Sequence, residues 1–238
     1  MRKIFFLLLA MVLLPITAKA ASINSIDPMY VTPGETQITI SGSGFGDSSV
    51  YKYLYFGYTS AYSSSWSDSQ IIVTAPYSLY SSGNIELSGS FKTGQTCYGT
   101  YCYDKTEYQK LTGPKYYLLP QVTETTKTIY DNGIFEVVGK YFGTTQGSVS
   151  LSGNSCRILK WQSNYIKCEV PQIGNQWDSV GYSIRIPDSN NYDLTGSVSY
   201  LSSLSNDKYS YEQTYLKKTK VNKVWDKYTG KGVVVAVI

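Results

Sequence analysis

Polar and apolar residues alternate in short stretches along most of this chain. Examples are QITIS at residues 37–41 and YSIRI at residues 182–186. Such alternation turns one set of side chains toward a core and the other toward solvent, which is typical of half-buried β-strands. Turn residues punctuate the region between residues 21 and 201, and no helical periodicity is sustained there. The pattern predicts an all-β fold of the sandwich kind.

The pattern also repeats within the chain. ITISGSGFG at residues 38–46 aligns with FEVVGKYFG at 135–143, and WSDSQIIVTAP at 66–76 aligns with WQSNYIKCEVP at 161–171. The aligned tryptophans and the aligned prolines are each 95 residues apart. Because this spacing is close to the length of one immunoglobulin-like domain, the sequence predicts two tandem copies of one β-sandwich.

Each copy contains a phenylalanine and a tryptophan that we expect to be structural. Phe45 and Phe142 follow glycines that stand where a strand passes into a turn, so we expect both rings to fold back into the core. Trp66 and Trp161 each precede a strand with an inward-facing isoleucine. Core packing is therefore favoured over ligand stacking for both tryptophans.

These segments resemble the IPT/TIG family, immunoglobulin-like domains found in plexins, certain transcription factors and many bacterial surface proteins. The resemblance covers residues 22–200 and includes the opening Ile26-Asp-Pro28. It implies a sandwich that binds protein or glycan, or that spaces other domains, and it does not imply catalysis. The second copy looks like the extracellular version of the domain, which implies a disulfide between Cys156 and Cys168.

The N-terminus indicates export. Residues 1–20 contain basic residues, an apolar run and an Ala-Lys-Ala end, as a secretory signal peptide does. No later apolar run is long enough for a membrane span.

Cys97 and Cys102 are separated by four residues in a turn-rich segment, which suits a small disulfide at a hairpin tip in an exported protein. A metal site is the alternative, and we predict none.

Charge and composition limit the chemistry that the chain can perform. It has 21 Lys and Arg against 17 Asp and Glu, and the excess lies at the two ends, so the acidic body is a poor partner for nucleic acid. Histidine is absent, which excludes a Ser-His-Asp arrangement within these residues. We predict no cofactor.

Two polar features leave alternatives open. Asp188, Asn190, Asn191 and Asp193 could offer oxygen ligands to calcium, but such loops are usually turns. Many of the 24 tyrosines cluster at residues 51–62 and at 97–108. They could form a contact platform for sugar or protein, although tyrosine is also an ordinary strand residue, and the ordinary interpretation is favoured.

The last residues form a different pattern. TKVNKVWDKYTGKGVVVAVI, with Trp225, closely resembles the start of the subtilisin-like serine endopeptidases. In that family the strand leads directly into the Asp of an Asp-His-Ser triad, so the resemblance implies that this Asp would follow Ile238. It implies acyl transfer in the parent protein, with a peptide as substrate, and packing of Trp225 onto the catalytic domain. None of the three triad residues is present.

The sequence thus predicts two tandem immunoglobulin-like sandwiches followed by a fragment of an α/β subtilisin-like domain. The predicted segments are a signal peptide at 1–20, sandwiches at 21–118 and 119–201, a linker at 202–220, and the truncated peptidase start at 221–238. The predicted function is that of a secreted or cell-surface, non-catalytic front end of a serine endopeptidase. The alternative is a non-enzymatic adhesin that binds glycan or protein.

Overall fold

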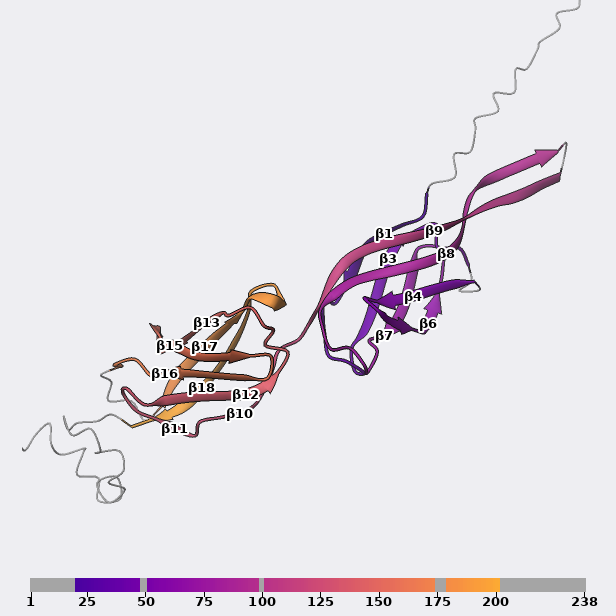
Figure 1. Ribbon diagram of the computed structural model, residues 1–238. Coiled ribbons are helices and arrows are strands. Elements are labelled where there is room, and N and C mark those ends of the chain that lie inside the picture. Colours follow the sequence, from indigo (N-terminus) through magenta and orange to yellow (C-terminus); the bar gives the residue numbers. More distant parts are fainter. Residues whose placement is uncertain (1–19, 48–50, 99–100, 174–178, 202–238) are drawn as a thin grey trace, which may run out of the picture. The chain divides into compact units, whose positions relative to one another are not determined.

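A computed structural model describes residues 20–47, 51–98, 101–173 and 179–201 (Figure 1). The predicted signal peptide, the linker at 202–220, and the peptidase start with Trp225 lie outside the described residues. The described chain consists of β-strands and one 3-10 helix, Pro187–Ser189. The all-β prediction is confirmed. The chain divides into two compact units between Tyr116 and Tyr117.

The first unit packs a four-stranded sheet and a five-stranded sheet into a sandwich. The four-stranded sheet has the order β1 (Ser22–Asp27), β3 (Gln37–Ser43), β7 (Gln70–Thr74), β6 (Ser63–Trp66). The five-stranded sheet has the order β2 (Tyr30–Val31), β9 (Tyr101–Leu118), β8 (Gly83–Tyr98), β4 (Lys52–Phe56), β5 (Thr59–Ala61).

The second unit repeats this strand order. Its four-stranded sheet runs β10 (Gln121–Thr125), β12 (Ile134–Lys140), β16 (Tyr165–Glu169), β15 (Arg157–Gln162). Its five-stranded sheet runs β11 (Thr128–Ile129), β18 (Tyr192–Tyr200), β17 (Ser179–Ile186), β13 (Ser148–Leu151), β14 (Asn154–Ser155). Each strand of one unit therefore has a counterpart at the same place in the other.

The alternation in the sequence matches the burial of the strands. Ile38 and Ile40 of β3 are fully buried, as are Phe135 and Val137 of β12, whereas the residues between them are more accessible. This is the period-2 pattern expected where one face of each sheet covers a core.

The two repeated phenylalanines lie in the cores. Phe45 and Phe142 are both fully buried. Their rings pack against the glycines of the preceding strands, Gly42 and Gly139, where an added Cβ would overlap the ring and a backbone carbonyl of the neighbouring strand. These glycines are therefore needed for close approach of the ring.

The two tryptophans lie at the margins of the cores rather than at their centres. Trp66 is partly buried, packs edge-on against the Phe45 ring, and donates its indole N–H to the carbonyl of Gly46 at 3.0 Å. Trp161 is partly buried against the core of the second unit. Its Nε1 is buried and has no hydrogen-bond partner within the described part of the chain.

Cys156 and Cys168 do not form the expected disulfide in the structure. Both are free and buried, Cys156 just before β15 and Cys168 in β16. Interaction with the Cys156 thiol, together with burial, raises the pKa of Cys168. The strands thus bring the two sulfurs together as expected. The physical difference is that each thiol packs as a small apolar group in the core, with no covalent bond between the two sulfurs.

Candidate binding surface on the first unit

A β-hairpin extends beyond the sandwich of the first unit. β8 and β9 pair from Gly83 with Tyr116 to Tyr98 with Tyr101, but β4 pairs with β8 only as far as Gly89 (Figure 1). Phe91 is the last fully buried residue of β8 before its end. We call the described residues beyond it, 92–98 and 101–107, the arm.

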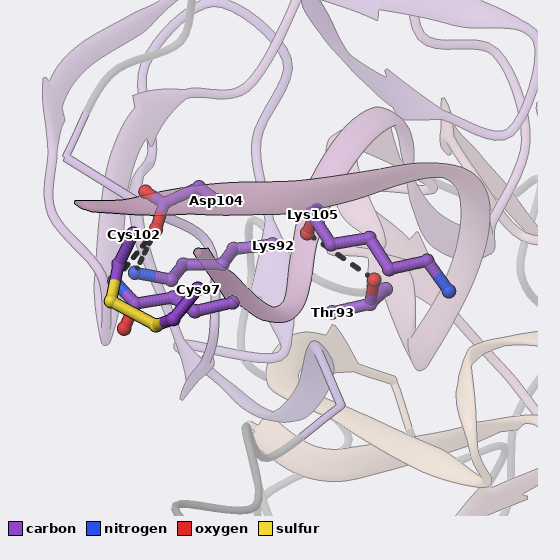
Figure 2. A network of polar contacts seen from close by, with 7 residues as sticks. Lys92, Thr93, Cys97, Cys102, Asp104 and Lys105 are labelled. Carbon is purple, nitrogen blue, oxygen red and sulfur yellow. Dashed lines mark hydrogen bonds and ion pairs between the residues drawn. A yellow bond between two sulfur atoms is a disulfide. The ribbon is translucent and has the colours of Figure 1, made fainter. Parts of the chain in front are cut away.

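The arm is cross-linked close to its tip. Cys97 and Cys102 are directly opposite in the register, and they form a disulfide (Figure 2). A disulfide at this place is what the sequence indicates. Because an isolated two-stranded hairpin is at best marginally stable in water, the cross-link supplies order that a core does not supply here.

Polar contacts join the two strands of the arm below the disulfide. The Lys92 ammonium lies 2.6 Å from the Asp104 carboxylate (Figure 2), and Gln95 donates to the same carboxylate at 2.9 Å. These hydrogen bonds, first that from Lys92 and then that from Gln95, lower the pKa of Asp104. Lys105 forms a second ion pair with Glu107 at 2.9 Å. The arm is therefore held by charge pairs across and along its strands.

The register sorts the side chains of the arm onto two faces. Directly paired residues share a face, and successive residues alternate. Tyr98, Tyr101 and Tyr103 consequently lie on one face, which we call the tyrosine face. The disulfide, Gln95 and Asp104 lie on the other, the disulfide face. The three tyrosines have 73%, 73% and 64% of their surface exposed.

A groove lies where β4 and β5 approach β6. Its volume is about 340 Å³, and we call it the Trp66 groove. It is lined by Lys52, Tyr53, Leu54, Ser60, Ala61, Tyr62, Ser63 and Trp66. The Lys52 ammonium lies 5.8 Å from the centre of the Trp66 ring and 5.9 Å from that of Phe91. Burial lowers the pKa of Lys52, against an opposing effect of Asp47.

The tyrosine cluster at residues 51–62 is divided between the groove and its surroundings. Tyr53 and Tyr62 line the groove, and Tyr62 has 91% of its surface exposed. Tyr58 is at the turn between β4 and β5 and does not line it. The sequence singles out both tyrosine clusters but favours an ordinary strand role. In the structure most of these tyrosines are strand residues, as that interpretation expects, and most of their rings are exposed to solvent.

The polar loop considered for calcium uses its carboxylates within the protein. Asp188 accepts hydrogen bonds from the backbone N–H groups of Thr144 and Thr145, at 2.7 and 3.0 Å. Asp193 pairs with Arg185, whose hydrogen bond lowers the pKa of the carboxyl. Within the described ranges, no three His, Cys, Asp or Glu side chains gather as a metal site would require.

The Trp66 groove and the arm offer contact rather than acid–base chemistry. Their polar groups are hydroxyls, amides, the Lys52 ammonium and the ion pairs of the arm, which suit hydrogen bonding and contact with rings. No helix in the described segments has the length and apolar character needed to span a bilayer.

Several solved structures are similar to this chain at low identity. The extracellular region of plexin A4 is 12% identical and has a TM-score of 0.33, with 78% of this chain covered and 16% of that one. A Bacteroides ovatus protein, SGBP-B of a mixed-linkage glucan utilization locus, solved with a mixed-linkage heptasaccharide, is 12% identical. Its TM-score is 0.31, with 78% of this chain and 45% of that one covered.

A surface glycan-binding protein of Prevotella bryantii is also 12% identical, with a TM-score of 0.37 and coverage of 78% and 42%. The chain thus spans less than half of each of these three proteins. No curated protein matches the chain. Residues 21–102, which form most of the first unit, match the family model of the IPT/TIG domain, in agreement with the resemblance of the first copy.

Proposed function

We propose that this chain is a binding module that contacts an external ligand through the Trp66 groove of its first unit. The observation that carries the proposal is the lining of this groove, which Tyr53, Tyr62 and Trp66 share with Lys52, whose ammonium lies over the Trp66 ring. Aromatic rings with a polar edge give large contact area at little cost in conformational entropy. The match of residues 21–102 to a domain family that binds or spaces supports this role.

We place the module outside the cell. The signal-like residues 1–20 and the exposed Cys97–Cys102 disulfide both fit an oxidising compartment. We also propose that the second unit is an IPT/TIG domain in tandem with the first. The equal strand order and the equivalent Gly-Phe packing at Gly139 and Phe142 support this assignment.

The test of the binding role is an array of purified glycans and candidate surface proteins probed with the purified chain. A groove variant, Ser60→Arg with Tyr62→Ala, places a long side chain in the groove and removes an exposed ring. It should weaken specific binding at least ~10-fold, as expected for loss of a central aromatic contact. Tyr58→Ala, at a residue 97% exposed and outside the groove, is the control and should bind as the wild type does. Binding that is equal in all three proteins would rule out the groove.

A second candidate concerns the parent protein. The pattern TGKGVVVAVI at residues 229–238 favours a subtilisin-like endopeptidase of which this chain is the non-catalytic front end. Sequencing the gene beyond the codon for Ile238 tests this directly. If the next residues form an Asp-Ser/Thr-Gly motif, with histidine and serine motifs further on, the result supports the peptidase. A stop codon or an unrelated sequence would rule out the peptidase. Hydrolysis of casein by the purified chain would contradict a non-catalytic role.

A further inference from the structure

We propose that the tyrosine face of the arm is a docking surface for an uncharged glycan chain. The inference rests on the proposed binding function and adds a second contact site, formed by Tyr98, Tyr101 and Tyr103, together with the kind of ligand that it takes. The arm has no sandwich sheet against it in the described chain, yet it is cross-linked and ion-paired along its length (Figure 2).

The three rings are close neighbours by register. Tyr98 is paired with Tyr101 across the two strands, and Tyr103 is two residues further along the same face, opposite Thr96. Side chains so related are near enough to form one continuous surface. The face then continues to the directly paired residues Gly94 and Lys105, and an added Cβ at Gly94 would meet nothing within 4 Å, so the space above Gly94 is open.

The cross-strand contacts that order the arm lie away from the rings. The disulfide, Gln95 and the Lys92–Asp104 ion pair are all on the disulfide face. These cross-strand groups therefore hold the strands on the face opposite the rings. The Lys105–Glu107 ion pair follows Tyr103 on the tyrosine face itself, and the three rings still have 64–73% of their surface exposed. A surface ordered before binding loses less conformational entropy when a ligand docks, and such preorganisation raises affinity.

The charges of the arm favour an uncharged ligand. Two lysines and two acids lie in it, and they form the pairs Lys92–Asp104 and Lys105–Glu107. The formal charge of the arm is therefore zero, and its ammonium groups are neutralised locally. An acidic polymer, whether nucleic acid, anionic lipid or sulfated glycan, would find no excess positive potential here.

What the face does offer is ring surface and hydroxyl groups. Three phenols and the hydroxyl of Thr96 can donate and accept hydrogen bonds, and the rings present flat apolar faces between them. A neutral sugar chain has the matching properties, with apolar C–H faces and hydroxyl edges.

Strand pairing with a second copy of the chain is a weaker explanation of the arm. The register of β8 and β9 shifts between Lys92 and Gly94, which marks a bulge. Bulges and lysines on exposed strands are devices that discourage edge-to-edge pairing. The features of the arm thus favour contact through its face.

The test is affinity electrophoresis of the purified full chain in gels that contain soluble polysaccharides. Galactomannan, pullulan and hydroxyethylcellulose are the neutral probes, and polygalacturonate and heparin are the acidic ones. We expect at least one neutral polysaccharide to retard the chain and neither acidic one to do so. The triple variant Tyr98→Ala/Tyr101→Ala/Tyr103→Ala should raise the Kd for that polysaccharide at least ~10-fold, since a few aromatic residues commonly carry most of the binding energy of a contact surface.

The matched control is Tyr108→Ala. Tyr108 lies on the same strand with 71% of its surface exposed, but on the disulfide face, so its loss should leave the Kd unchanged. Equal binding by the triple variant and the wild type overturns the proposal, as does retention by acidic polysaccharides only or by none of the neutral ones. A protein ligand lost in the triple variant, with no polysaccharide bound, overturns the glycan assignment.

The groove variant separates this inference from the proposed function. If Ser60→Arg/Tyr62→Ala loses binding while the triple variant keeps it, the arm is not a glycan contact and the binding module stands. If the triple variant loses binding and the groove variant keeps it, the arm carries recognition and the groove does not. Circular dichroism of each variant, which should overlay that of the wild type, shows that the fold is retained.

Discussion

At the scale of single residues, two glycines allow aromatic rings of the cores to pack directly against the strand backbone. Gly42 and Gly139 lie under the rings of Phe45 and Phe142, and a methyl group at either would overlap a ring and a carbonyl. We expect Gly42→Ala and Gly139→Ala each to lower the free energy of unfolding by ~1–3 kcal/mol, as overpacking in cores does. Urea unfolding measures this. Gly94→Ala, where the methyl would meet open space, is the control and should change stability by less than ~0.5 kcal/mol.

The thiols of Cys156 and Cys168 give a second prediction at this scale. Because both are buried and the pKa of Cys168 is raised, neither should react with a thiol reagent while the chain is folded. Denaturation without a reductant should then release two reactive thiols, in keeping with the free pair of the structure. Titration with a chromogenic disulfide reagent checks this. No thiol released on denaturation would instead establish the disulfide that the IPT/TIG resemblance implies.

A hydrogen bond on the second unit makes stability depend on pH. The Tyr165 hydroxyl donates to Glu136 at 2.7 Å, and this bond raises the pKa of Tyr165 to about 12. The unfolded phenol has a pKa of about 10, so the contribution is fully present below pH ~10 and is lost as the pH rises through about 12. The urea midpoint of the wild type should therefore fall more between pH 9 and pH 12 than that of Tyr165→Phe. Parallel declines would show that this bond contributes nothing.

At the scale of elements, the arm depends on its cross-link. Closing so short a loop should stabilise it by ~2 kcal/mol in the chain-entropy account. In Cys97→Ser/Cys102→Ser we expect amide hydrogens at residues 92–98 and 101–106 to exchange markedly faster, because the arm has no core of its own. Hydrogen exchange with mass spectrometry measures this, and the amides of β3 and β7 serve as internal control. Unchanged exchange in the arm would mean that its ion pairs suffice.

The arm also marks the limit of prediction from periodicity. Strands such as β3 and β12 were predictable because one face of each is buried, and burial imposes the alternation of residue types. Beyond Phe91 neither face of β8 is buried, so nothing in the sequence distinguishes a long hairpin from a loop. Only the spacing of Cys97 and Cys102 indicated a hairpin tip there. The Trp66 groove was not predictable, since it depends on how the edge strands β5 and β6 approach each other.

At the scale of the whole molecule, the repeat in the sequence corresponds to two separate cores. Phe56 in the first unit packs against the Tyr116 ring at 5.1 Å, and Phe135 in the second packs against Tyr182 at 5.4 Å. The core cluster around Phe135 consists entirely of residues from the second unit. A cavity made in one core removes contacts from that core alone.

Each core should consequently set the stability of its own unit. We expect Phe56→Ala and Phe135→Ala each to cost ~3–5 kcal/mol and to lower one calorimetric transition while leaving the other in place. Val138→Ala, on the same strand as Phe135 but at a residue 38% exposed, is the matched control and should move neither transition by more than a few degrees. If either phenylalanine variant lowers both transitions by the same amount, the two cores unfold as one cooperative body. The two units would then not have independent stabilities.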